Sequence, residues 1–195
     1  MKFLSLLVSA IAAFAVMAGS AAGTQTYRMY DAESGSFISV PGPGSIRGSA
    51  IKRELVDYQT NLAAGTIVVE TSERRLYFVL EGGKAMKYGV GVGKEGMTWS
   101  GTNRITRKAE WPDWRPTANM LRRDPTLPRY MPGGPENPLG ARALYLGSTM
   151  YRLHGTAEPW SIGEAVSSGC IRLTNEDIAD LYERVRVGTT VIVRH

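Results

Sequence analysis

The regular segments of this 195-residue chain are short, and most of them have the composition of β-strands. Residues 66–70 and 75–80 are runs of β-branched and aromatic residues, and residues 81–84 between this pair and the next run carry the Gly-Gly signal of a hairpin turn. Further strands are predicted at residues 86–92, 143–146, 150–153 and 189–193. A chain built from such segments must pair them into a sheet, so a mostly β fold is predicted.

One segment near the C-terminus has helical character instead. Thr174 is a suitable N-cap, and acidic residues follow it where the helix dipole favours negative charge. One apolar face is formed by Ile178, Leu181, Tyr182 and Val185. Gly188 fits the position just after a helix, so we predict a helix over residues 174–188. The expected fold is mostly β (β-rich α+β), a single sandwich-like domain with one or two helices.

The N-terminus predicts the compartment. Lys2 and the apolar residues 3–17 have the pattern of a signal peptide, with Ser20 and Ala22 at the cleavage site, so residues 1–22 are predicted to be removed after export. An uncleaved membrane anchor is the alternative. Residues 23–63, rich in Gly, Ser and Pro, are predicted to be an N-terminal arm before a domain over 64–194. The expected location is the periplasm or the cell wall.

The charge is mildly basic, +5 for the whole chain, and the basic residues are scattered. This pattern predicts no nucleic-acid partner and is compatible with an anionic wall. Residues 111–140 hold seven of the ten prolines together with Trp111 and Trp114. A stretch of this length without a regular pattern is usually functional or disordered, and its aromatic residues favour an ordered flap over a site.

The chain has a single cysteine, Cys170, and two histidines, of which His195 is the last residue. An unpaired thiol in an exported protein is either buried and inert or kept for its reactivity. His154 stands sixteen positions before Cys170, near enough for a loop to bring an imidazole beside the thiol and take its proton. So few His and Cys residues provide no plausible zinc site, and neither a metal nor a cofactor is predicted.

The residues around this pair resemble the L,D-transpeptidase catalytic domain family, also called the YkuD-type domain. That family has a His-Gly-Thr segment, then a loop, then Ser-(His or Ser)-Gly-Cys-(apolar)-Arg. This chain has His154-Gly155-Thr156, then Trp160 and Gly163, then residues 167–172, SSGCIR. Residues 131–140 also resemble the family's segment before the catalytic strands. The resemblance covers residues 64–194, and one departure is Ser168, where many members have a second histidine.

The resemblance implies a role for each matching residue. Cys170 would be the nucleophile and His154 its base, with the backbone carbonyl of Gly155 holding the imidazole ring. The N–H groups of Gly169 and Cys170 would form an oxyanion hole. Arg172 would orient the loop or a substrate carboxylate, with a purely structural ion pair as the alternative. Substrate contacts are expected from Ser168, Trp160 and Thr156, although packing is an alternative for Trp160.

The activity implied by the family is acyl transfer on peptidoglycan stem peptides. Cys170 would form a thioester with a tetrapeptide stem and expel D-Ala, and an amine would then take the acyl group. That amine belongs either to a second stem, giving a 3→3 cross-link, or to an outer-membrane protein or lipoprotein. The alternatives are an L,D-carboxypeptidase, a non-catalytic peptidoglycan-binding module, and a secreted β domain with an inert cysteine. The family's cysteine is a carbapenem target, so a carbapenem separates enzyme from binder.

Overall fold

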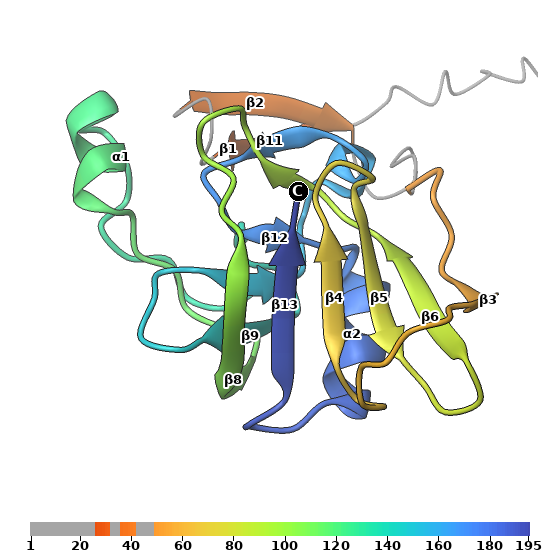
Figure 1. Cartoon of the computed structure of the whole chain (residues 1–195). Coiled ribbons are helices and arrows are strands. Elements are labelled where there is room, and N and C mark those ends of the chain that lie inside the picture. Colours follow the sequence, from red (N-terminus) through yellow and green to blue (C-terminus); the bar gives the residue numbers. More distant parts are fainter. Residues whose placement is uncertain (1–25, 32–35, 42–48) are drawn as a thin grey trace, which may run out of the picture.

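The computed structural model describes residues 26–31, 36–41 and 49–195 of the chain (Figure 1). The predicted signal peptide therefore lies outside the described residues. The first two strands, β1 (Thr26–Asp31) and β2 (Ser36–Pro41), pair with each other as an antiparallel hairpin. No helix within the described ranges has the length and apolar character that a membrane crossing requires.

The main sheet has nine strands, in the order β12-β10-β9-β8-β13-β4-β5-β6-β3. Their bounds are β3 Glu54–Asp57, β4 Ile67–Glu70, β5 Arg75–Val79, β6 Lys84–Gly89, β8 Gly101–Glu110, β9 Arg142–Leu146, β10 Arg152–His154, β12 Ile171–Arg172 and β13 Thr190–Arg194. Two short strands, β7 (Val92–Gly93) and β11 (Ala165–Ser167), pair separately. The predicted turn between β5 and β6 is confirmed, with Gly82 and Gly83 both at positive φ.

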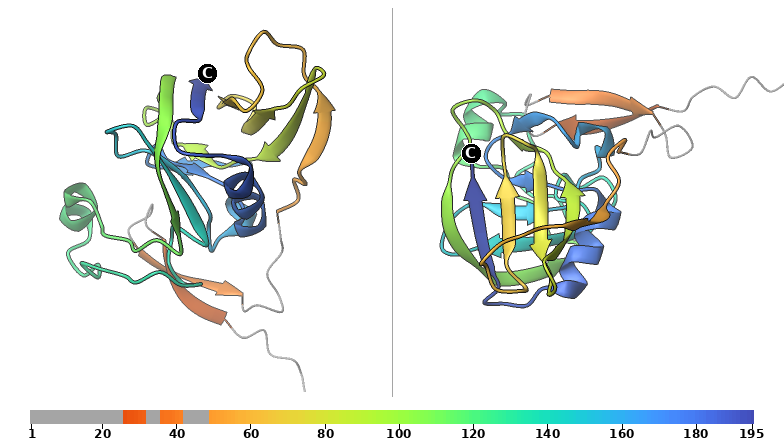
Figure 2. Two further views of the ribbon diagram at one scale, coloured as in Figure 1. Left: turned by 90° about the horizontal axis from the view of Figure 1, so that it is seen from below. Right: turned by 45° about the vertical axis from the view of Figure 1, so that its right-hand side comes forward.

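The sheet curls strongly, so that β9 and β12 lie behind β8 and β13 in the view of Figure 1, and Figure 2 shows the same curvature from two other sides. The enclosed core is apolar and includes Ile67, Leu76, Leu144, Leu153 and Leu181, each of which is fully buried. The prediction of a β-rich fold with one or two helices is confirmed, since the structure has α1 and α2.

Helix α2 (Asn175–Arg184) packs on β9 and β10 through the predicted apolar face. The side chain of Thr174 accepts a hydrogen bond from the Asp177 N–H at 3.0 Å, as expected of an N-cap. The predicted end at residue 188 is wrong, because the helix stops at Arg184. The ammonium of Lys108 binds the carbonyls of Tyr182 and Val185 at 2.6 and 2.7 Å, and these are groups that a longer helix would have used internally.

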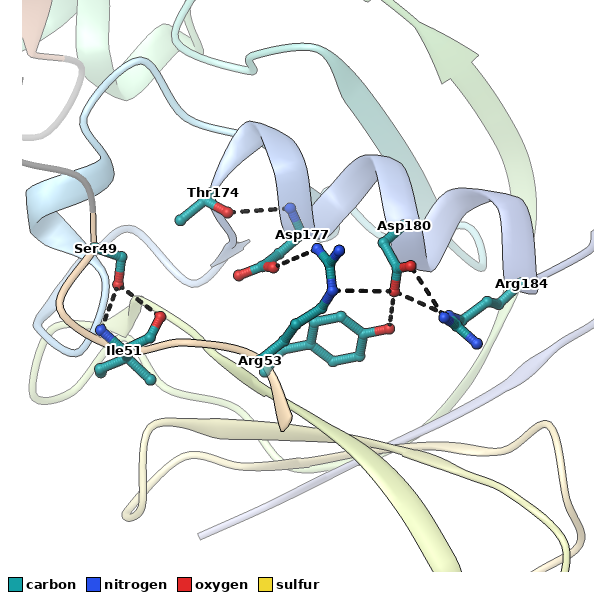
Figure 3. Close-up of polar contacts among 8 residues, drawn as sticks. Ser49, Ile51, Arg53, Thr174, Asp177, Asp180 and Arg184 are labelled. Atoms are coloured by element: carbon teal, nitrogen blue, oxygen red, sulfur yellow. Dashed lines mark hydrogen bonds and ion pairs between the residues drawn. The ribbon is translucent and has the colours of Figure 1, made fainter. Parts of the chain in front are cut away.

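The segment just before residue 64, where the resemblance to the family begins, packs on the domain. Strand β3 pairs with β6 at the edge of the sheet. Just before it, Arg53 forms an ion pair of 3.1 Å with Asp177 on α2 (Figure 3). Asp180, one turn later, accepts hydrogen bonds from Tyr88 and Arg184. Residues 49–57 therefore connect the edge of the sheet to helix α2, through strand β3 and the Arg53–Asp177 ion pair.

The proline-rich stretch 111–140 is folded around a small core of its own. Trp114, Leu127 and Leu139 are buried together, and a β-bridge joins Trp114 to Met131. Its helix α1 (Ala118–Arg123) projects away from the sheet in Figures 1 and 2. The other end of the segment is near the predicted site, because the Ala141 N–H donates to the Asn175 side chain at 2.8 Å.

Candidate active site

Strand register brings the two sequence motifs together. Strands β10 and β12 are parallel neighbours, with Leu153 opposite Ile171 and His154 opposite Arg172. Side chains alternate along a strand, and Leu153 and Ile171 are both buried in the core. His154 and Arg172 therefore project from the other face. Cys170 directly precedes β12, so continued alternation places its thiol on the same face as the imidazole.

The imidazole of His154 is 4% exposed and its Nδ1 lies 2.5 Å from the Gly155 carbonyl oxygen. A carbonyl only accepts, so Nδ1 carries the proton and Nε2 is left as the acceptor. Burial, followed by the positive charges of Arg172 and Arg152, lowers the pKa of His154 to about 3. The ring is neutral at pH 7, which is the form that a general base needs.

Close packing explains why the residue after His154 is a glycine. A Cβ on Gly155 would collide with the side-chain oxygen of Asn175 and would lie 3.0 Å from the Ala141 nitrogen. The predicted contact between the Gly155 carbonyl and the imidazole thus depends on a backbone that fits closely beneath helix α2.

The thiol of Cys170 is half-buried, and its Sγ lies 3.9 Å from the Met150 carbonyl oxygen. Within the described part of the chain, no hydrogen bond joins this thiol to His154. In the resting site the two side chains therefore lie on one face without a direct hydrogen bond, and such contacts often tighten only when substrate binds.

The loop before Cys170 is held by hydrogen bonds and aromatic stacking. Ser167 Oγ accepts from the Gly169 N–H at 3.1 Å and donates to the Cys170 carbonyl. The Trp99 indole donates to the Gly169 carbonyl at 2.9 Å, and its ring stacks on Tyr151. Of the two predicted oxyanion donors, Gly169 N–H is engaged by Ser167. Cys170 N–H has no acceptor among the described residues.

Arg172 forms an ion pair with Glu158, with 2.9 Å between Nη1 and Oε2, and both side chains are nearly buried. This contact joins β12 to the loop that follows His154. The geometry matches the predicted loop-orienting role and the structural alternative. A direct contact of Arg172 with a substrate carboxylate stays a prediction.

The three expected substrate contacts occupy different environments. Thr156 is buried, and its hydroxyl accepts from the Glu158 N–H at 3.0 Å, which shapes the loop. Trp160 is 37% exposed on the short 3₁₀ helix Pro159–Ser161, and Ser168 is exposed beside the nucleophile. A cavity of about 720 Å³ near the N-terminus of α2 is lined by Thr156 but by neither Cys170 nor His154. The predicted catalytic pair thus does not line that cavity.

Sequence reasoning missed several residues that build this site. Trp99 and Tyr151 hold the loop before Cys170, and Glu158 pairs with Arg172. Asn175 ties Ala141, at the end of the proline-rich segment, to the start of helix α2. Each of these contacts joins segments far apart in sequence, so no local pattern marks them.

Comparison with known proteins agrees with the site. The model of the L,D-transpeptidase catalytic domain matches residues 64–193. The probable L,D-transpeptidase ErfK/SrfK of Escherichia coli is 37% identical over 172 residues, covering 84% of this chain and 53% of that protein. The probable L,D-transpeptidase YbiS of Escherichia coli is 41% identical over 134 residues, covering 64% and 43%. The chain spans about half the length of these curated relatives.

Two solved structures share the fold. One, from Brucella melitensis and described as a probable carnitine operon oxidoreductase, is 44% identical with a TM-score of 0.51, covering 74% of this chain and 94% of that one. The catalytic domain of the Enterococcus faecium L,D-transpeptidase is 20% identical with a TM-score of 0.53, covering 69% and 100%. With the family model matching two thirds of its length and its Cys and His motifs meeting on one sheet face, the chain belongs to the L,D-transpeptidase catalytic domain family.

Proposed function

We propose that the chain is an exported peptidoglycan L,D-transpeptidase that acts through a thioester on Cys170. The observation that carries this proposal is the pairing of β10 with β12, which puts a reachable thiol and a neutral imidazole on one face. The ring is oriented by the Gly155 carbonyl, so its free Nε2 is the base. Family membership supplies the substrate class, the stem peptides of the wall.

The reaction proceeds in two half-reactions. His154 takes the thiol proton, and the sulfur of Cys170 attacks the carbonyl of the third stem residue at its L centre. The Cys170 N–H stabilises the oxyanion, and Gly169 N–H joins it when Ser167 Oγ releases it. The intermediate collapses, His154 returns its proton to the leaving amine, and D-Ala departs. An acceptor amine then attacks the thioester and loses its proton to His154. The C–S bond breaks, and His154 returns the proton to the sulfur of Cys170.

The acceptor defines the final product. A stem amine gives a 3→3 cross-link, and the amine of an outer-membrane protein or lipoprotein attaches that protein to the wall. Water gives a tripeptide, the L,D-carboxypeptidase outcome. We place residues 1–22 as the signal peptide, residues 23–63 as the arm and residues 64–194 as the catalytic domain, with the protein in the periplasm or cell wall.

The oxidoreductase description of the Brucella relative is less well supported by this chain. Gly91, Gly93 and Gly96 have the spacing of a dinucleotide-binding motif, but such a motif works where it opens a helix after a strand. Here residues 94–97 form a turn, and the next regular element is β8. The histidine and cysteine motifs favour acyl transfer.

Intact-mass spectrometry tests the proposal. After incubation with a purified disaccharide tetrapeptide, the wild-type protein is expected to gain the mass of the donor less D-Ala. Cys170→Ala should remain folded by circular dichroism, because the substitution removes only one small atom group. It should gain no mass, because no other residue can form the thioester. A wild-type protein that stays unmodified by both the tetrapeptide and a carbapenem would instead be a wall-binding module.

A further inference from the structure

A row of side chains crosses the sheet and ends at the nucleophile. Arg107 on β8 is opposite Tyr145 on β9, and Tyr145 is opposite Arg152 on β10. Paired residues of neighbouring strands project to the same side, and Arg152 is two residues before His154. Since Leu153 is opposite Ile171, the next position in this row beyond Arg152 is Cys170.

The row is positively charged and stacked. Both guanidinium groups lie over the Tyr145 ring, that of Arg107 at 3.7 Å and that of Arg152 at 5.5 Å from its centroid. They approach from opposite neighbours of strand β9, so the ring lies between two cations. Among the described residues, neither guanidinium forms an ion pair with a carboxylate. The positive charge beside the thiol is therefore not neutralised by a carboxylate of the described residues.

Arg152 is the member next to Cys170 in the row, and the two side chains share a hydrogen-bond acceptor. Its Nη2 donates to the Met150 carbonyl at 3.3 Å, and the same oxygen is the acceptor of the Cys170 thiol. The Nε of Arg152 is buried and has no hydrogen-bond partner within the described structure. Nε and Nη2 form one edge of the guanidinium, which binds a carboxylate with two parallel hydrogen bonds once Nη2 leaves the Met150 carbonyl and the edge turns outward.

We infer that Arg152, supported by Tyr145 and Arg107, is the subsite that binds a free carboxylate of the acyl-donor stem peptide and positions the donor over Cys170. The inference rests on the proposed function, because it takes the donor to be a wall peptide. Apart from the carboxylate of the departing D-Ala, a stem carries one on its γ-linked glutamate and, where its diamino acid is a dicarboxylate, one on that residue. Either of these two gives the guanidinium a bidentate partner that stays with the acyl group. No residue of the His and Cys motifs supplies this contact.

Binding is measured in the Cys170→Ala background, where no turnover interferes. The ligands are a free tetrapeptide stem and two versions of it, one amidated on the glutamate carboxyl and one on the diamino-acid carboxyl. The free stem is expected to bind about tenfold more tightly than one amidated version, the size expected of a charge-assisted pair. Arg152→Gln should remove this preference, and Arg152→Lys, which keeps the charge but not the two-donor edge, should retain part of it.

The control is Arg194→Gln, which removes an arginine paired with Glu70 on the surface and should keep the preference. Thermal unfolding of each variant identifies those that fold. Equal binding of all three peptides by the Cys170→Ala protein overturns the inference, as does a preference that survives Arg152→Gln. Thioester formation by the Cys170-intact protein is measured in parallel. A preference without a thioester refutes the proposed enzyme alone, and a thioester without a preference refutes the subsite alone.

Discussion

Gly169 is constrained by its backbone and by its neighbours. Its φ of +108° is a conformation that only glycine adopts without strain. A Cβ there would also lie 2.6 Å from Tyr151 Cε1 and 3.0 Å from the Met97 carbonyl oxygen. Gly169 is therefore packed between the Tyr151 ring and the Met97 backbone, and its position determines the direction of the Cys170 N–H.

Replacement of Gly169 by alanine should impair both stability and acylation. The backbone strain is expected to cost about 1–3 kcal/mol of unfolding free energy, and displacement of the loop should slow carbapenem acylation of Cys170 by about a hundredfold. Gly188→Ala is the matched control, because Gly188 has a φ of +95° but open space around it. That variant should lose stability and keep its acylation rate. Equal acylation rates in both variants would show that the loop position is unimportant.

At the scale of elements, the end of helix α2 is determined by a strand distant in sequence. Lys108 extends from β8 and binds two carbonyls at the last turn, while its ammonium lies 4.0 Å from the Tyr182 ring centroid. A cation at this end of a helix is also favoured by the dipole. Two carbonyls, a ring and a helix terminus thus share one partly buried ammonium.

Lys108→Met should keep most of the aliphatic packing and remove this cap. We expect a loss of about 1–3 kcal/mol in unfolding free energy, because hydrogen bonds from a charged donor are lost and two carbonyls are left without it. Lys87→Met serves as the control, since its ammonium makes an ion pair with the exposed Glu54, and exposed ion pairs contribute little to stability. Chemical denaturation of both variants provides the comparison, and equal losses would argue against the capping role.

The same strand illustrates what sequence could and could not predict. Strands β4 and β13 could be predicted from the sequence, because each contains a run of consecutive β-branched apolar residues. Strand β8 is the longest of the main sheet, yet Ile105 is its sole buried residue, and polar or charged side chains occupy most of the other positions. Its pairing is determined by β9 and β13 on either side. No local periodicity signals such a strand.

The candidate site also has residues that the sequence identifies and contacts that it does not. Cys170 and His154 were identifiable because their motifs are contiguous in sequence. The contacts that orient them, from Glu158, Trp99 and Asn175, connect separate elements and appear only once the chain is folded. Arg152 lies two residues from His154, but its role depends on the register of three strands.

For the whole molecule, the buried imidazole links catalysis to acid stability. Burial lowers the pKa of His154 to about 3, whereas the imidazole of an unfolded chain titrates near 6.5. Between these values the unfolded state binds more protons than the folded state. The free energy of unfolding contributed by this group therefore falls as the pH falls from about 6.5 towards 3, by up to about 1.4 kcal/mol for each pH unit.

His154→Asn tests this linkage, because asparagine keeps a donor for the Gly155 carbonyl and does not titrate. Wild type should lose stability relative to the variant as the pH is lowered from 6.5 to 4, with the two curves parallel above pH 7. His195→Asn, at the exposed last residue, is the control and should follow wild type throughout. Urea unfolding at a series of pH values supplies the curves. If wild type and His154→Asn stay parallel down to pH 4, the imidazole is not held neutral by burial, and the assignment of a neutral general base in the resting enzyme would have to be abandoned.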